Sequence, residues 1–262
     1  MTNRVSHESP QRRLTGVVIL HGFTANLESV RELFGPLGRF DLKIASPLLR
    51  GHGASSPNEL RGVTWTEWLE DAERALETLT GIDGKAVVIG HSMGALLAMQ
   101  LAARRPELVD SLVLATPPVR LTSLLGPGRP LNFLAPLISH FVDRWNMDTK
   151  FADPGNAIMP KQYDWSPTKT ILSMFDLLQE TLRIAGSVHV PALILHCRNE
   201  SIVLPQSAEI LLRSLGTPPE KKSIVWFEKT DHQIFCDCER KAAVDAAVRF
   251  VADRLNHKPL NP

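Results

Sequence analysis

The sequence has few of the features that mark secreted, membrane-spanning or nucleic-acid-binding proteins. Only three of its 262 residues are cysteine, so a framework of disulfides is not expected. It has no run of about eighteen apolar residues, the length that a helix needs to cross a membrane. The formal net charge is +1, which gives no electrostatic reason to expect binding to nucleic acid or to an anionic membrane.

The sequence also lacks clear signals for export and for metal binding. Residues 1–13 are polar and have no apolar middle segment of the kind found in signal peptides. We therefore expect a mobile tail there and a cytoplasmic protein. Cys236 and Cys238 lie close together, but no second pair of cysteines or histidines accompanies them, so we expect no metal site.

What the sequence does have is the composition of an ordinary globular core, with 44% hydrophobic and 22% charged residues. Short apolar runs, read as buried strands, alternate with helical patterns along most of the chain. This alternation predicts a doubly wound, mostly parallel sheet of the α/β class, in which ligands bind beyond the carboxyl ends of the strands. The strands are expected at residues 15–20, 42–45, 86–89, 111–115, 192–196 and 223–227, and helices at 27–37, 64–79, 95–105 and 239–255.

Residues 117–188 interrupt the alternation. They are rich in proline and glycine at first, and they contain two apolar patterns at helical spacing, 134–145 and 171–178. We interpret the segment as a helical cap inserted over the carboxyl edge of the sheet, so that residues 14–116 and 189–256 form the core. The alternative is a set of helices packed on the flank of the sheet.

The stretch Gly90-His91-Ser92-Met93-Gly94 fits the pattern G-x-S-x-G. It lies between a predicted strand and a predicted helix, which is the context of a nucleophile elbow. The small residues at its ends let strand and helix approach, and the strained turn presents the Ser92 hydroxyl and aims the Met93 N–H at whatever Ser92 attacks. The alternative is a glycine-rich turn with an incidental serine.

A serine nucleophile needs a base, and the base needs a group that orients it. His232 follows the last predicted strand, where a base is required; the alternative is a structural histidine. Glu200 is the one carboxylate in the loop after strand 192–196, so we predict that it orients His232. Its alternative is a solvated or helix-capping carboxylate. Asp231 is adjacent to His232 and would project elsewhere.

The loop after the first predicted strand, His21-Gly22-Phe23-Thr24, should supply a second backbone donor to the oxyanion. Gly22 permits close approach of the backbone, and Phe23 is the expected donor, together with Met93.

Taken together, these motifs resemble the α/β-hydrolase superfamily and, within it, the bacterial carboxylesterases and monoacylglycerol lipases. The resemblance runs from about residue 17 to about residue 255. It also includes Arg50-Gly51-His52-Gly53 and the strand and loop of residues 191–205. It implies the α/β-hydrolase fold, an acyl-serine intermediate, no cofactor, and a cap that shapes an apolar acyl pocket. The family usually has Asp where this chain has Glu200.

From these observations we predict a serine carboxylic-ester hydrolase that acts on short- to medium-chain acyl esters, including monoacylglycerols. The partner is then a small-molecule ester. The first alternative is another reaction of the same triad, such as thioester cleavage, C–C bond hydrolysis or acyl transfer. The second is a ligand-binding protein without enzymatic activity.

Overall fold

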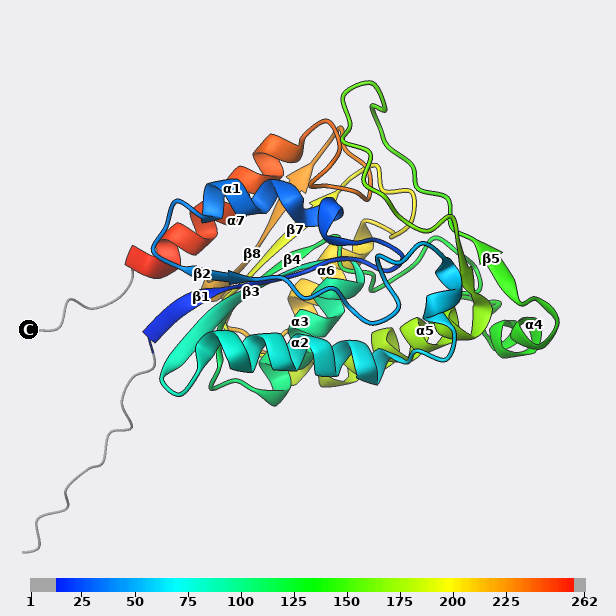
Figure 1. Ribbon diagram of the computed structural model, residues 1–262, viewed down its shortest axis with the longest axis horizontal. Coiled ribbons are helices and arrows are strands. Elements are labelled where there is room, and N and C mark those ends of the chain that lie inside the picture. Colours follow the sequence, from blue (N-terminus) through cyan, green and yellow to red (C-terminus); the bar gives the residue numbers. More distant parts are fainter. Residues whose placement is uncertain (1–12, 257–262) are drawn as a thin grey trace, which may run out of the picture.

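The computed structural model describes residues 13–256. Its centre is a six-stranded sheet in the order β2-β1-β3-β4-β7-β8, and every neighbouring pair is parallel (Figure 1). The parallel sheet predicted from the sequence is therefore confirmed. Its strands are β1 (Arg13–Leu20), β2 (Lys43–Ala45), β3 (Gly84–His91), β4 (Val109–Ala115), β7 (Ala192–Cys197) and β8 (Lys222–Phe227).

Helices cover both faces of the sheet (Figure 1). Among these residues, no helix combines the length and hydropathy needed to cross a membrane. The α-helices are α1 (Phe34–Leu37), α2 (Trp65–Thr80), α3 (Met93–Arg104), α4 (Ala135–Phe141), α5 (Thr168–Ile184), α6 (Gln206–Ser214) and α7 (Arg240–Asn256). Short 3-10 helices span Leu27–Leu33, Pro57–Leu60, Asn132–Leu134, Ala185–Ser187 and Pro219–Lys221.

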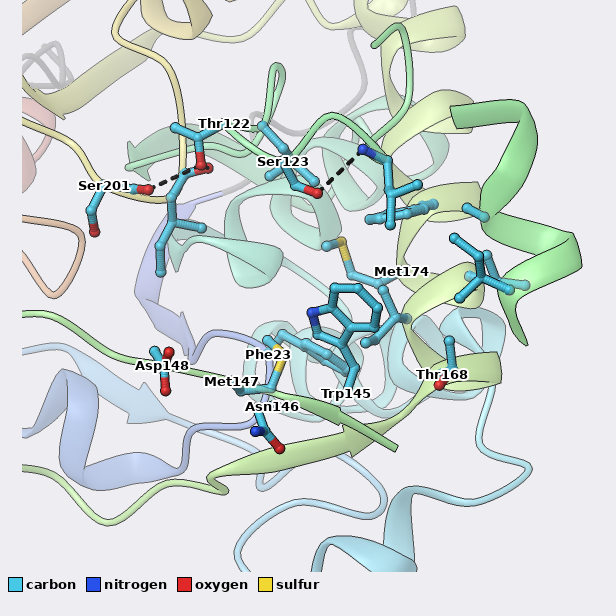
Figure 2. Close-up of a pocket in the computed structure, with 18 residues that line it drawn as sticks. Phe23, Thr122, Ser123, Trp145, Asn146, Met147, Asp148, Thr168, Met174 and Ser201 are labelled. Atoms are coloured by element: carbon cyan, nitrogen blue, oxygen red, sulfur yellow. Dashed lines mark hydrogen bonds between the residues drawn. The ribbon is translucent and has the colours of Figure 1, made fainter. Parts of the chain in front are cut away.

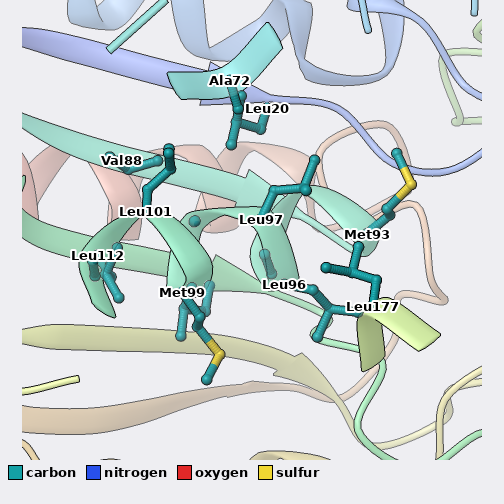
Figure 3. Close-up of a cluster of buried hydrophobic side chains, with 14 of the residues drawn as sticks. Leu20, Ala72, Val88, Met93, Leu96, Leu97, Met99, Leu101, Leu112 and Leu177 are labelled. Atoms are coloured by element: carbon teal, nitrogen blue, oxygen red, sulfur yellow. The ribbon is translucent and has the colours of Figure 1, made fainter. Parts of the chain in front are cut away.

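The sheet separates two apolar cores. The larger core lies between the sheet and α2, α3, α5 and α6, and the smaller one lies under α1 and α7. Figure 3 shows Leu96, Leu97 and Met99 of α3 packed in the larger core. Alternate residues of β3 reach opposite cores, Val88 the larger and Val87 and Ile89 the smaller. Burial on both faces is the reason that this strand is apolar throughout.

Helix α2 begins where the sequence predicts. The Thr64 N–H donates to Glu67 Oε2 at 2.9 Å, which forms one half of a capping box. Trp68 is fully buried on its inner face, among the side chains that the helical spacing assigned to packing. The inner face of α2 therefore packs in the larger core.

Residues 117–188 leave the sheet after β4 and return before β7. They carry α4, α5 and a small antiparallel pair, β5 (Arg144–Asn146) and β6 (Trp165–Pro167). In Figure 1, α4 and β5 lie at the end of the molecule beyond the carboxyl ends of the strands. Their division into a separate cap domain stays a prediction.

Several local expectations were wrong. The first helical pattern in the cap stops at Phe141, and Trp145 lies in β5; Leu137 and Phe141 are exposed. Their periodicity therefore does not mark a buried face. The helix expected at residues 27–37 is a 3-10 helix followed by a single α-helical turn. Its Gly35-Pro36 pair shortens the α-helical part, because proline has no N–H to donate.

The tail predicted for residues 1–13 lies outside the described residues apart from Arg13, which begins β1 and pairs with Gly84. The start of β1 and the end of α7 lie at the amino-terminal ends of the strands (Figure 1). There Arg254 of α7 donates to Asp110, close to the start of β4, at 2.8 Å.

Candidate active site

Ser92 occupies a sharp turn between β3 and α3. Its backbone has φ 52° and ψ −118°, a left-handed conformation that a residue with a side chain adopts only when its surroundings enforce it. The enforcement comes from close packing. A Cβ on Gly90 would lie 2.2 Å from the Gly94 carbonyl oxygen, and one on Gly94 would lie 2.3 Å from the Leu20 oxygen. Only glycine fits at both positions, as the motif predicts.

The three predicted side chains meet beyond the carboxyl ends of β3, β7 and β8. His232 Nε2 lies 2.9 Å from Ser92 Oγ, and His232 Nδ1 lies 2.9 Å from Glu200 Oε1. The chain thus brings together residues that are 140 and 32 positions apart. The longer side chain of Glu200, compared with the family's usual Asp, still reaches the imidazole.

Glu200 is held as an acceptor by its own loop as well. The N–H groups of Ile202 and Val203 donate to the same oxygen, Oε1, at 3.2 and 3.3 Å. Burial alone would raise the pKa of Glu200, but the facing imidazole and these hydrogen bonds outweigh it and lower the pKa below its ordinary value. The group is therefore a carboxylate at neutral pH.

The pKa of His232 moves the other way. Burial alone would lower it, but the charge of Glu200 and the hydrogen bond between them outweigh burial and raise it. A raised pKa strengthens the imidazole as a proton acceptor. The pair has the electrostatic arrangement of a general base with an orienting carboxylate.

His91, which occupies the position between the first glycine and the serine of the G-x-S-x-G motif, contacts His232 and helps to hold it in place. Its Nε2–H donates to the carbonyl oxygen of His232 at 2.9 Å, and the two rings are 5.3 Å apart. Burial, followed by the nearby His232, lowers the pKa of His91 to about 3. This ring is neutral near pH 7 and works as a fixed donor. This contact could not be predicted from the sequence, because it depends on the position of a loop 141 residues away.

The loop after β1 lies against Ser92. A Cβ on Gly22 would lie 3.3 Å from Ser92 Cβ and 3.1 Å from His91 Nδ1, so the backbone of Gly22 is in contact with the elbow. His21 fixes this loop, because its Nδ1–H donates to the Gly22 oxygen and its Nε2 accepts the Leu49 N–H. Phe23 follows directly, and the predicted donor thus belongs to a loop that contacts Ser92.

A cavity of about 260 Å³ opens beside the loops that carry Phe23 and Glu200. Figure 2 shows Phe23, Trp145 and Met174 around it, with Asp148 and Asn146 toward one end. Thr122 closes the wall by donating to the Ser201 oxygen at 3.0 Å. The apolar lining comes largely from residues 117–188 and includes Leu125, Ala135, Ile138, Ile171, Leu172 and Phe175.

Sequence reasoning missed Asp231. It does project away from the imidazole of its neighbour, but its Oδ1 accepts the N–H of Ser201 at 2.8 Å and that of His232 at 2.7 Å. It thereby joins the loop of Glu200 to the loop of His232. Its place beside the base was visible in the sequence, but its partner in a loop 30 residues away was not.

Comparison with known proteins gives a consistent picture. The sequence pattern of the serine aminopeptidase S33 family matches residues 11–239. A thermostable monoacylglycerol lipase of Bacillus sp. (strain H-257) is 23% identical over 90% of this chain and 90% of its own length. A carboxylesterase of Bacillus subtilis (strain 168) is 23% identical over 86% of this chain and 87% of its own.

Solved structures agree on the fold. One described with the metagenome-derived lipolytic enzymes LipS and LipT matches with a TM-score of 0.82 at 22% identity, and the match covers 92% of this chain and 95% of the other. The α/β-hydrolase fold predicted from the sequence is confirmed.

Proposed function

The chain belongs to the serine aminopeptidase S33 family, and on that premise we propose that it is a serine carboxylic-ester hydrolase whose nucleophile is Ser92. The observation that carries the proposal is the continuous line of hydrogen bonds from Ser92 Oγ through His232 to Glu200. Relatives described as a monoacylglycerol lipase and a carboxylesterase support the ester substrate.

In this proposal His232 Nε2 accepts the proton of Ser92 Oγ as that oxygen attacks the ester carbonyl. Glu200 holds the Nδ1–H and stabilises the imidazolium that forms. The backbone N–H groups of Phe23 and Met93 stabilise the oxyanion. The imidazolium then protonates the departing alcohol, and water activated by the same base releases the acid from the acyl-serine.

The apolar cavity supports an acyl chain as the larger part of the substrate. Its walls carry Ile138, Ile171 and Phe175, and Phe23 places one end of it next to the proposed oxyanion site. Burial of methylene groups is worth about 0.8 kcal/mol each. We therefore propose esters of short- to medium-chain acids, including monoacylglycerols, as substrates.

The test is hydrolysis of p-nitrophenyl esters from acetate to dodecanoate, with purified Ser92→Ala as the comparison. We expect activity in the wild type and a loss of about 10⁶-fold in the variant, the size seen when a serine nucleophile is removed. Thioesters and an aminoacyl p-nitroanilide measured beside the esters discriminate other reactions of the same triad. Ester hydrolysis that survives in Ser92→Ala would refute the proposal.

We also propose a cytoplasmic location. Cys197, Cys236 and Cys238 are all free thiols, which suits a reducing compartment. Fractionation of cells that express the chain, followed by immunodetection, tests this, and recovery outside the cytoplasm would contradict it.

A further inference from the structure

Asp237 is a buried carboxylate that takes no part in the proposed hydrolysis. It lies in the loop between His232 and α7, and it is fully buried. Four backbone N–H groups donate to it. Two come from its own loop, Asp231 at 2.9 Å and Cys238 at 2.8 Å, and two come from residues 152 and 153, at 2.8 and 3.2 Å.

The two distant donors belong to a long loop that we call the strap, residues 147–164, which connects β5 to β6. Its ends are joined, because the Met147 N–H donates to the Asp164 oxygen at 2.8 Å. In Figure 1 the strap, in green, reaches back to the orange loop before α7. Met147 and Asp148 at its start line the apolar cavity. The strap therefore contacts both the cavity and the loop of His232.

The strap has further anchors on the core. The Ile158 N–H donates to the Cys236 oxygen at 2.7 Å, and the Tyr163 N–H donates to the Thr24 oxygen at 2.9 Å. The Tyr163 hydroxyl donates to the Gly51 oxygen at 2.9 Å. Asp237 is distinguished from these anchors because one of its oxygens, Oδ2, accepts from the strap at Ala152 and from Asp231 at the same time.

A short path of hydrogen bonds then leads to the base. Asp237 holds the N–H of Asp231, and Asp231 in turn holds the N–H of His232 and of Ser201. Burial alone would raise the pKa of Asp237, but its N–H donors lower it, so a charged acceptor is present at neutral pH. Without this acceptor, the buried N–H of Asp231 would lose its partner, and the loop of His232 would have to move to supply another one.

We propose that Asp237 is a positioning residue: it fixes the loop of His232 to the strap, so that the placement of the imidazole against Ser92 depends on the strap being seated. This inference rests on the proposed function for its kinetic consequence. The placement of the imidazole by the strap can be tested whether or not the protein has that function.

The test is Asp237→Asn, which keeps the size of the side chain but replaces one acceptor oxygen by an amide. We expect kcat for p-nitrophenyl butyrate to fall by about 10- to 100-fold, since a displacement of about 1 Å costs about that much, with a smaller change in KM. The far-downfield proton resonance of the His232 Nδ1–H should shift or broaden. Asp110→Asn is the matched control, because Asp110 pairs with Arg254 at the opposite edge of the sheet.

A second variant acts from the strap alone. Ala152→Pro removes the N–H that donates to Asp237 without changing any residue in the loop of His232. It should lower kcat in the same way and add little to the effect of Asp237→Asn in a double-mutant cycle. Lys150→Pro, two residues earlier, is the control for proline in this loop. If Asp237→Asn does not fold, Ala152→Pro decides by the same two measurements.

The outcomes separate the two proposals. A wild-type protein without esterase activity contradicts the proposed function, while the His232 resonance still tests the role of Asp237. An active wild type combined with unchanged kcat and an unchanged resonance in Asp237→Asn or Ala152→Pro overturns the positioning role. Additive effects of the two variants would overturn it as well.

Discussion

Acidification should destabilise this protein steeply, because three imidazoles are buried in neutral form. Burial lowers the pKa of His21 to about 4 and, together with a neighbouring histidine in each case, the pKa values of His52 and His91 to about 3. In the unfolded chain each returns to about 6.5. Between these values the unfolded state binds more protons than the folded state, so stability is present above pH 6.5 and is lost as the pH falls.

The size of the effect follows from these values. At pH 5, protonation favours the unfolded state by about 2 kcal/mol for each ring, and by about 6 kcal/mol for the three together. His232 acts in the opposite sense, since its raised pKa makes the folded state take up its proton first and adds stability as the pH falls through that pKa. The net loss in the free energy of unfolding should still be several kcal/mol. This is a large part of the total, which for a typical domain is about 5–15 kcal/mol.

Urea unfolding at 25 °C, followed by tryptophan fluorescence at pH 7.5, 6.5, 5.5 and 5.0, measures this loss. His52→Phe keeps a ring between Phe23 and Trp68 but cannot be protonated, so its free energy of unfolding should fall about 2 kcal/mol less than that of the wild type between pH 7.5 and 5. His140→Gln alters an exposed ring and should follow the wild type. The reasoning is refuted if the wild type keeps its stability down to pH 5, or if His52→Phe loses as much as the wild type.

Three further predictions concern the site. Glu200→Gln should lower kcat by about 10³–10⁴-fold. It should also move the acidic limb of the pH profile of kcat/KM to lower pH, because the charge of Glu200 raises the pKa of His232. Glu200→Asp keeps the charge and should leave the limb where it is. An unmoved limb in Glu200→Gln would mean that another group raises the pKa of His232. Gly90→Ala should lower the free energy of unfolding in urea by about 1–3 kcal/mol and slow the labelling of Ser92 by a fluorophosphonate. Gly35→Ala is the control, because a Cβ there meets nothing within 4 Å, and it should change neither quantity. Phe23→Ala should leave kcat on p-nitrophenyl acetate nearly unchanged and raise KM for the octanoate, since the backbone donor stays and the cavity wall is lost; equal losses on both esters would argue against it.

The sequence predicted the parts of this molecule that depend on local pattern. Buried parallel strands are short apolar runs, and a nucleophile elbow has small residues at fixed positions, so both could be recognised without a structure. The meeting of Ser92, His232 and Glu200 could be predicted as well, because parallel strands end at one edge of the sheet. The geometry that supports them could not. The hydrogen bond from His91 to the His232 carbonyl joins the end of β3 to a loop 141 residues away.

The least predictable segment was residues 117–188. Helical spacing from 134 to 145 predicted a helix in the cap, but the chain forms a short helix and then a strand at Arg144–Asn146. Phe141 and Leu137 are exposed, so their apolar character does not reflect burial in this chain. Periodicity identifies a helix reliably only when its apolar residues face a core, and here part of the pattern faces outward.

Residues 13 and 256, the first and last that the structure describes, lie away from Ser92, and this has a practical consequence. The start of β1 and the last turn of α7 lie at the amino-terminal ends of the strands (Figure 1), whereas Ser92 follows the carboxyl end of β3. Immobilisation through a linker at either end therefore leaves the entrance to the cavity facing the bulk liquid. Such a support would hold every molecule in the same orientation, which random coupling through surface lysines does not do.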